Sequence, residues 1–284
     1  MIKNIGGAMA LSTLGINLGY AQPEGKITPV VLKGNIKHSV CSWVFEGISL
    51  EELAKACVDI GIASIELLGE KDWAMLNKYG LICALGIATE YGIIKGFNRL
   101  EHHDKLIADY AAMIPKAAAA GVPNLICFSG NREGQSDEDG LINCAKGLRK
   151  LMPVAEKYGV TLVIELLNEN DHKDYQCSNS KWGAALCEMV DSERLKLLYD
   201  IYHMQIMEGN IIDTINKYHR YIGHYHTAGV PGRHEIDDTQ ELNYPAIMRA
   251  IVKTGYKGYV AQEFIPLQEN KLESLRKGII ICDV

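Results

Sequence analysis

The sequence carries no large excess of charge of either sign, and this absence excludes one class of partner. Its 284 residues contain 29 Lys and Arg against 35 Asp and Glu, and no run of like charge reaches five residues. Nucleic-acid-binding domains usually present Lys and Arg clustered on one face. We therefore expect no nucleic-acid partner.

The sequence also lacks a CxxC pair, although it contains 8 cysteines. A chain of this length does not need a disulfide framework to fold. Most of the cysteines stand inside apolar segments, where cysteine usually behaves as a small buried hydrophobic residue. We expect free thiols at Cys41, Cys57, Cys83, Cys127, Cys144, Cys177, Cys187 and Cys282.

No apolar run has the length of a membrane span. The longest N-terminal run, Ile5–Leu18, follows Lys3, is rich in glycine and ends in small residues. This composition resembles a secretory signal, so we expect a signal segment over 1–22, a linker over 23–35 and no stable membrane insertion. The protein is then periplasmic or exported. If 1–22 is instead an unstructured extension, the protein is cytoplasmic.

Strand-like and helix-like segments alternate over residues 36–284, which we expect to form a single domain. Each strand-like segment is a short apolar run bounded by turn residues. The eight expected strands lie within Val40–Trp43, Ala63–Leu68, Leu81–Ala88, Asn124–Phe128, Thr161–Asn168, Leu195–Tyr202, Gly223–Gly232 and Gly258–Pro266.

The helices between these strands show capping and stop signals. Ser49 is the expected N-cap of the first, with Glu52 at the capping-box position and Gly61 as the stop. Pro115 predicts a kink or a break in the third helix. The other expected helices are Asp72–Tyr79, Leu100–Ala120, Gly140–Tyr158, a segment ending at Val190, Ile211–Tyr218, Tyr244–Thr254 and Asn270–Ile281.

Four of the strand-like segments each carry one metal-capable side chain near the C-terminal end. These are Glu165, Asp200, His226 and Glu263. A carboxylate in an apolar strand is costly to bury unless it is paired or bound to a metal. Barrel enzymes place such groups at the C-terminal ends of several strands, whereas an open sheet gathers them at one switch point. The pattern predicts an α/β fold, a (β/α)₈ TIM barrel, with one metal site.

Two segments point to a family. The segments 199–205 (YDIYHMQ) and 231–235 (PGRHE) resemble the hydroxypyruvate isomerase family. That family belongs to the xylose isomerase-like TIM barrels, which also include tagatose/psicose 3-epimerases and endonuclease IV. The similarity extends over nearly all of 36–284. The family has a glutamate, an aspartate, a histidine or glutamine, and a second glutamate at the four strand ends. Hydroxypyruvate isomerases usually have glutamine at the third position, whereas His226 is more similar to the keto-sugar epimerases.

The resemblance implies an isomerase that interconverts a small hydroxy-carbonyl compound, similar to hydroxypyruvate and tartronate semialdehyde, through an enediolate. Glu165 and Glu263 are then acid–base residues as well as metal ligands, and His203 and Arg233 bind the substrate. Three carboxylates and one imidazole suit a single Mn²⁺, Mg²⁺ or Co²⁺ ion. A small molecule is the expected partner, and a homo-oligomer is compatible with the sequence.

Three other functions stay open: a keto-sugar 3-epimerase, an endonuclease IV-like metal phosphodiesterase, and a sugar-binding barrel without catalysis. His203 is either a substrate ligand or a residue that orients Asp200. His224 shares a strand face with His226 and either faces the substrate or is hydrogen-bonded inside the barrel. For Glu66, Trp43 and Phe45 two interpretations stay open: each either lines the substrate pocket or belongs to the barrel interior. We interpret His102, His103 and His172 as solvated.

Overall fold

The computed structural model describes residues 30–284. The expected signal segment and residues 23–29 of the expected linker lie outside the described residues. The rest of the linker has no regular structure and lies against the end of the chain. The backbone N–H of Lys33 donates to Asp283 Oδ2 at 2.8 Å, and the Asn35 amide donates to the Val284 carbonyl at 2.8 Å.

Eight parallel strands form the centre of the molecule, in the sheet order β2-β1-β8-β7-β6-β5-β4-β3. Backbone hydrogen bonds between the β2 and β3 segments, such as Leu67 N–H to the Leu85 carbonyl at 2.8 Å, join the two ends of this sheet. The strands are β1 (Lys37–Cys41), β2 (Ser64–Glu66), β3 (Leu85–Ile87), β4 (Asn124–Cys127), β5 (Thr161–Glu165), β6 (Leu195–Asp200), β7 (Ile222–Thr227) and β8 (Tyr259–Gln262). The predicted (β/α)₈ barrel is confirmed. The strands β2 to β8 are shorter than expected, and β1 lies earlier than the expected Val40–Trp43, because Ser42–Phe45 form a 3₁₀ helix.

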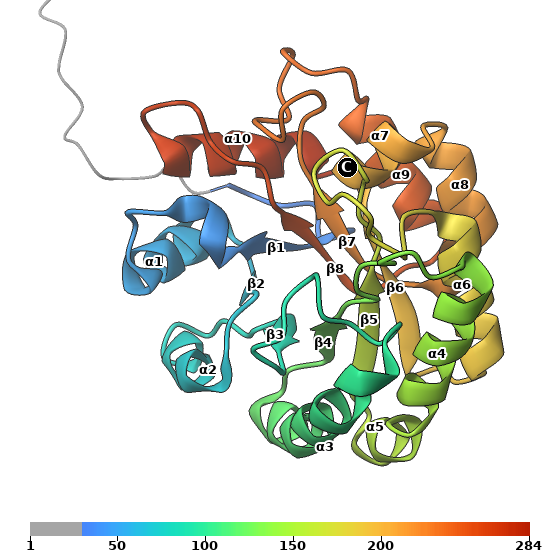
Figure 1. Cartoon of the computed structure of the whole chain (residues 1–284). Coiled ribbons are helices and arrows are strands. Elements are labelled where there is room, and N and C mark those ends of the chain that lie inside the picture. The colour runs from blue at the N-terminus through green and yellow to red at the C-terminus, as the bar shows by residue number, and fades with distance from the viewer. Residues whose placement is uncertain (1–29) are drawn as a thin grey trace, which may run out of the picture.

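The helices lie outside the strands and follow one another around the barrel (Figure 1). This places a hydrophobic layer between each helix and the sheet, as expected for a parallel barrel. The α-helices are α1 (Leu50–Ile60), α2 (Glu70–Asn77), α3 (His103–Ala120), α4 (Asp137–Arg149), α5 (Met152–Tyr158), α6 (Ser180–Val190), α7 (Ile201–Met207), α8 (Ile211–Tyr218), α9 (Tyr244–Lys253) and α10 (Lys271–Cys282). Short 3₁₀ helices occupy Ser42–Phe45, Leu100–His102 and His219–Tyr221.

The first helix begins and ends as its sequence predicts. The Ser49 side chain accepts a hydrogen bond from the backbone N–H of Glu52, and Gly61 has the left-handed conformation that ends many helices. Of the kink or break predicted at Pro115, the break does not occur, because α3 continues through that residue. Its buried face, which includes Tyr110 and Ile114, keeps the helix together despite one missing backbone hydrogen bond.

The single helix expected over Gly140–Tyr158 is in fact two, α4 and α5. Pro153 has no N–H to donate to the carbonyl of Arg149, four residues earlier, so the first helix ends there. A second correction concerns the strand expected to reach Tyr202. It ends at Asp200, and α7 begins at the next residue.

The buried apolar residues form two clusters. The larger lies between strands and helices, and a smaller cluster joins Leu85, Ile126, Val163 and Leu198 from the neighbouring strands β3 to β6. All eight cysteines are buried and unpaired, as predicted. Within residues 30–284, no helix combines the length and the apolar character needed to cross a membrane.

Candidate active site

The four predicted ligands converge at the C-terminal end of the barrel. Glu165 and Asp200 end β5 and β6, His226 is the penultimate residue of β7, and Glu263 directly follows β8. All four are buried, and one ligand atom from each lies within 4.8 Å of the others. The structure therefore brings together the side chains that the strand-end pattern selected.

Asp200 divides its two carboxylate oxygens between the backbone and the cluster. As the N-cap of α7, its Oδ1 accepts from the backbone N–H groups of Tyr202 at 2.8 Å and His203 at 3.2 Å. Its Oδ2 lies 3.4 Å from Arg233 Nη2 and 3.6 Å from His203 Nε2. The helix cap thus fixes Asp200 with one oxygen directed toward the other ligands.

Glu263 is held from two sides. Its Oε1 accepts a hydrogen bond from Trp43 Nε1 at 2.8 Å, and its Oε2 accepts one from Arg233 Nη2 at 2.7 Å. His226 Nδ1 also lies 2.8 Å from Oε2. Burial opposes ionisation of Glu263, but His226 and Arg233 outweigh it and hold its pKa well below the usual range.

Glu165 differs, because no side-chain donor binds its carboxylate among residues 30–284. The nearest polar atom in an ion-pair arrangement is His226 Nδ1, 3.6 Å from Oε1. Glu165 also lines the cavity described below. It is the less constrained of the two glutamates.

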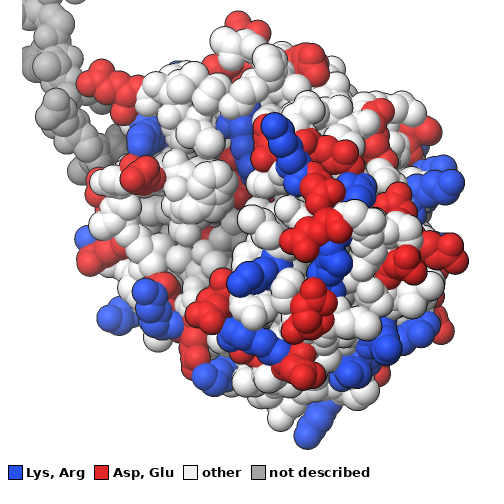
Figure 2. Space-filling model, in the orientation of Figure 1, with Lys and Arg blue, Asp and Glu red and all other residues white. Residues whose placement is uncertain are grey.

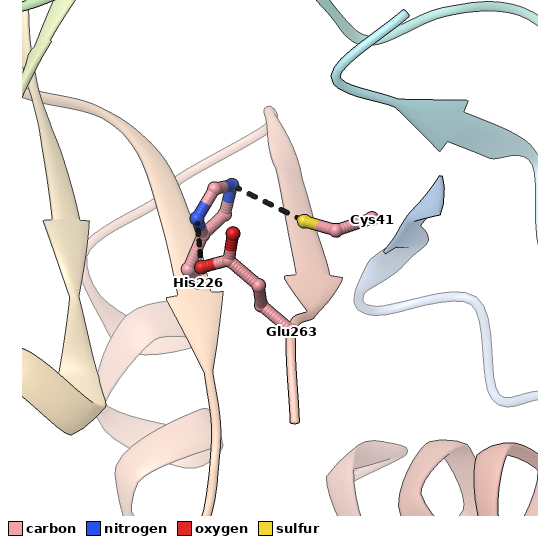
Figure 3. A group of neighbouring side chains, drawn as sticks. All are labelled: Cys41, His226 and Glu263. Atoms are coloured by element: carbon pink, nitrogen blue, oxygen red, sulfur yellow. Dashed lines mark hydrogen bonds and ion pairs between the residues drawn. The ribbon is translucent and has the colours of Figure 1, made fainter. Parts of the chain in front are cut away.

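The two ring nitrogens of His226 face different groups (Figure 3). Nδ1 faces Glu263, whereas Nε2 lies 3.8 Å from Cys41 Sγ and 2.8 Å from Glu66 Oε1. His224 Nε2 lies 2.8 Å from the same Glu66 oxygen. His224 is therefore hydrogen-bonded inside the barrel, one of the two alternatives that the sequence left open.

Burial alone would favour the neutral form of Glu66, but His224 and His226 outweigh it and lower its pKa to about 2. Burial raises the pKa of Cys41 well above its usual value, so this residue is a neutral thiol and a weak ligand.

His203 has a fixed tautomer. The backbone N–H of Asn168 donates to His203 Nδ1 at 3.1 Å, so the ring hydrogen is on Nε2. Burial and the charge of Arg233 hold the pKa of His203 well below its usual value, which keeps the ring neutral. Its Nε2 is buried without a hydrogen-bond partner among residues 30–284, and the residue lines the cavity. Both predicted roles of His203, substrate ligand and residue that orients Asp200, fit the geometry. The residue lines the cavity, and its Nε2 lies 3.6 Å from Asp200 Oδ2.

Arg233 is already paired. Besides its contacts with Glu263 and Asp200, its guanidinium carbon lies 5.3 Å from the ring centres of both Trp43 and Tyr202. It is the one Lys or Arg side chain among the described residues that line the cavity.

A divalent cation fits this donor set. Burial raises the pKa of Asp200 to about 7, because the Glu263 and Glu165 carboxylates add to the cost of a buried anion and Arg233 offsets only part of it. Three buried carboxylates with one nearby guanidinium leave negative charge that a cation would neutralise. His226 Nδ1 faces two of these carboxylates, 2.8 Å from Glu263 Oε2 and 3.6 Å from Glu165 Oε1, so it lies where a cation would meet the carboxylate oxygens. The oxygen-rich donor set suits a hard divalent ion.

Two residues of the cluster, Glu165 and Glu263, line a cavity of about 440 Å³. Its opposite wall is mostly apolar and comes from β2, β3, β4 and the loops after them. The wall residues include Leu67, Ile87, Ile93, Ile126 and Phe128. A second, more open cavity of about 760 Å³ adjoins it and shares the 90–93 loop and His172.

The roles of several other residues follow from these positions. Trp43 lines the cavity, whereas Phe45 belongs to the core. The prediction that His103 is solvated is wrong, because it is buried and hydrogen-bonded to the Phe97 carbonyl. His172 is partly exposed and lines both cavities. Sequence reasoning gave no role to Asn168, because its partner is 35 residues away in the chain.

Comparison with known proteins identifies the family. Residues 50–279 match the model of the xylose isomerase-like TIM barrel family. The chain belongs to that family, and its predicted fold is confirmed.

Curated relatives carry isomerase names. A 2-oxo-tetronate isomerase from Cupriavidus necator is 38% identical over 112 residues, which are 39% of this chain and 43% of that protein. The hydroxypyruvate isomerase of Escherichia coli K12 is 32% identical over 157 residues, 55% of this chain and 60% of that protein. A 2-oxo-tetronate isomerase from Pectobacterium atrosepticum is 26% identical over 243 residues, 79% of this chain and 90% of that protein. The chain thus spans about half the length of the first two.

Solved structures share the fold at lower identity. An AP endonuclease of family 2 from Brucella melitensis has a TM-score of 0.76 and 21% identity, over 84% of this chain and 97% of that one. A D-psicose 3-epimerase with D-tagatose from Clostridium cellulolyticum has a TM-score of 0.69 and 16% identity, over 85% and 89%.

Proposed function

We propose that this protein is a metal-dependent isomerase that moves a proton between adjacent carbons of a small hydroxy-carbonyl compound. The observation that carries the proposal is the convergence of Glu165, Asp200, His226 and Glu263 within 4.8 Å, with both glutamates lining a cavity. The isomerase names of the relatives support the same reaction class.

We propose Mn²⁺, Mg²⁺ or Co²⁺ as the ion that these four residues hold, since the set offers three carboxylates, one imidazole and no thiolate. When bound, such an ion supplies a Lewis acid that polarises a substrate carbonyl.

The proton is moved by the two glutamates. Glu165 lines the cavity without a donor on its carboxylate, so it is the residue that takes the proton from the C–H next to the carbonyl. The electron pair of that bond forms the C=C bond of an enediolate, and the substrate hydroxyl proton passes to the former carbonyl oxygen as the new carbonyl forms. A glutamate that has taken up a proton then returns one to the neighbouring carbon. Glu263, which Trp43 and Arg233 hold in place, is the second carboxylate within reach.

Two further residues bind the substrate. The Nε2 hydrogen of His203 faces the cavity without a partner, and we assign it to a substrate oxygen. Arg233 borders the same space and holds Glu263 and Asp200 through its ion pairs. Its guanidinium offers its remaining N–H groups to substrate oxygens.

Turnover in D₂O tests the proposal. The purified chain is incubated with Mn²⁺ and hydroxypyruvate, ketopentoses or ketohexoses, and the products are followed by NMR. We expect solvent deuterium on a carbon next to the carbonyl, and no turnover after chelation of the metal. Metal-independent turnover, or turnover that the Glu165→Gln variant retains at saturating Mn²⁺, contradicts it.

A second candidate, a keto-sugar 3-epimerase, is favoured by the cavity. A three-carbon acid fills little of about 440 Å³, and the outer cavity extends the space further. Arg233 is already paired with two carboxylates, which favours an uncharged substrate. The position of the label distinguishes the candidates: a neighbouring carbon for an isomerase, the same carbon with inverted configuration for an epimerase.

The remaining alternatives find less support. Acidic and basic side chains are interspersed over the face shown in Figure 2, unlike the basic surface that a nuclease presents to DNA. All three groups with metal-ligand spacing among residues 30–284 share His226, which favours one ion over a multi-metal array. A sugar-binding barrel without catalysis has no need of two glutamates in the cluster.

A further inference from the structure

The carboxylate of Glu66 lies beneath the ligand cluster and has no part in the proposed reaction. Glu66 ends β2, on the side of the barrel opposite Glu165 and Asp200 in strand order, and is fully buried. Its Oε1 lies 2.8 Å from both His224 Nε2 and His226 Nε2, and its Oε2 accepts a hydrogen bond from Ser39 Oγ at 2.6 Å.

This arrangement determines which nitrogen of His226 keeps its hydrogen when an ion binds. An ionised carboxylate can only accept hydrogen bonds, so Nε2, 2.8 Å from Glu66 Oε1, is a donor, and without an ion Nδ1 donates in the same way to Glu263. Only Nδ1 faces the cluster carboxylates, so it is the nitrogen whose hydrogen a bound ion displaces, while Nε2 keeps its hydrogen on Glu66. Figure 3 shows Nδ1 on the side of Glu263, away from Cys41, and Nδ1 is 2.8 Å from Glu263 Oε2.

We infer that Glu66 is a positioning residue that holds His226 as the Nε2–H tautomer, so that Nδ1 is available to the metal. The inference rests on the proposed metal dependence. A carboxylate that accepts the far N–H of a ligating histidine orients the ring and increases the basicity of the ligating nitrogen. Glu66 itself stays out of the coordination sphere.

The alternative is that Glu66, His224 and His226 hold an ion of their own, since they have metal-ligand spacing. The hydrogen bonds argue against it. Both histidines direct Nε2 at a single oxygen of Glu66, and Ser39 occupies the other oxygen. The carboxylate is therefore surrounded by donors, whereas an ion needs the lone pairs of the three residues to meet at one point.

Calorimetric titration of the full chain with Mn²⁺ tests the inference on the Glu66→Gln variant. The amide keeps the shape of the side chain but loses its charge. We expect about 10- to 100-fold weaker Mn²⁺ binding, the usual effect of losing a partner of a ligating histidine. The matched control is Asp283→Asn, which removes another buried carboxylate beside a buried histidine, His38, at 3.6 Å. Its Mn²⁺ affinity should stay within about twofold of wild type, since the pair lies away from the cluster.

A double-mutant cycle separates positioning from general loss of structure. If Glu66 acts through His226, Glu66→Gln should have little further effect on Mn²⁺ affinity in a His226→Gln background. The ¹⁵N spectrum of the Mg²⁺-loaded protein gives an independent readout. We expect the hydrogen of His226 on Nε2 in wild type, and a mixture of tautomers in Glu66→Gln.

Three results would overturn the inference: unchanged affinity in Glu66→Gln, an equal loss in the two backgrounds, or two Mn²⁺ ions per wild-type chain with one lost in the variant. Each leaves the proposed function standing, because wild type still binds Mn²⁺. A wild-type protein that binds no divalent ion contradicts both.

Discussion

The two halves of the barrel differ in what they place around the cavity. The half from β5 to β8 supplies the four cluster residues, one from each strand or its end. The half from β1 to β4 supplies Trp43 and an apolar wall that includes Leu67, Ile126 and Phe128. The metal-capable side chains thus lie on one side of the barrel, and most of the apolar residues that shape the cavity lie on the other.

Glu66 is the exception, since it belongs to the wall half but faces the cluster from below. Under the proposed function, the wall half sets the space for the substrate and the other half carries the reaction. Variants of each half should therefore affect different kinetic constants.

The largest effect should come from the base. Glu165→Gln at saturating Mn²⁺ should lower kcat by about 10²–10⁴, the usual contribution of a positioned general base. Glu263→Gln should lower kcat in the same range and also weaken Mn²⁺ binding. Stopped assays of kcat over a series of Mn²⁺ concentrations separate the two effects. A Glu165→Gln enzyme with near wild-type kcat would assign proton transfer elsewhere.

Loss of the metal should be the next largest. Wild type with Mn²⁺ at about 100 times its dissociation constant should gain about 2.7 kcal/mol in the free energy of unfolding. Asp200→Asn replaces an anionic ligand with a neutral amide, so this gain should nearly vanish at the same Mn²⁺ concentration. Thermal unfolding with Mn²⁺ and after chelation measures it. An equal gain in wild type and Asp200→Asn would place the ion outside the cluster.

Acid should weaken the metal site. Burial disfavours charged His226, but Cys41 Sγ and the Glu263 and Glu165 carboxylates outweigh it and raise its pKa well above 6.5 in the metal-free protein. A proton and a metal compete for Nδ1, so Mn²⁺ affinity should fall as pH drops through this raised pKa. His226→Gln should release about one proton fewer on binding. Titration calorimetry in buffers of different ionisation enthalpy counts the protons, and an unchanged count in the variant would remove His226 from the ligand set.

The smallest effect should come from the wall. Ile126→Val removes one methylene group from a buried residue of β4 that borders the cavity. It should cost about 0.5–1.5 kcal/mol of stability and change KM more than kcat, because the wall contacts substrate and transition state alike. Equal losses in kcat and kcat/KM would show that the wall also positions the reacting carbons.

Much of the fold followed from local patterns. Short apolar runs bounded by turns predicted the strands, and the strand-end carboxylates stood out because an acid in such a run is costly to bury. The boundaries were less accessible. Ile201 and Tyr202 have the apolar, aromatic character of a strand, so the predicted strand continued into what is the first turn of α7. The N-cap role of Asp200 was the contrary signal.

The network behind the ligands was not predictable from local sequence. Glu66 and His226 are 160 residues apart in the sequence, and the residues next to them in the sequence do not indicate that the two side chains are in contact. His172 stands in a polar loop, which suggested solvent rather than a cavity. Such contacts depend on how the barrel closes, and the sequence pattern alone does not carry that information.

The direct junction of β6 and α7 has an evolutionary consequence. Asp200 ends the strand, caps the helix and belongs to the cluster, with no loop residue in between. An insertion or deletion there would move the carboxylate and the helix start together. The connection over residues 228–243, by contrast, separates β7 from α9 and includes the exposed residues Asp238 and Thr239 beyond Arg233, where its length can change. Length variation among relatives should therefore be tolerated in this later part of the connection and strongly selected against after β6.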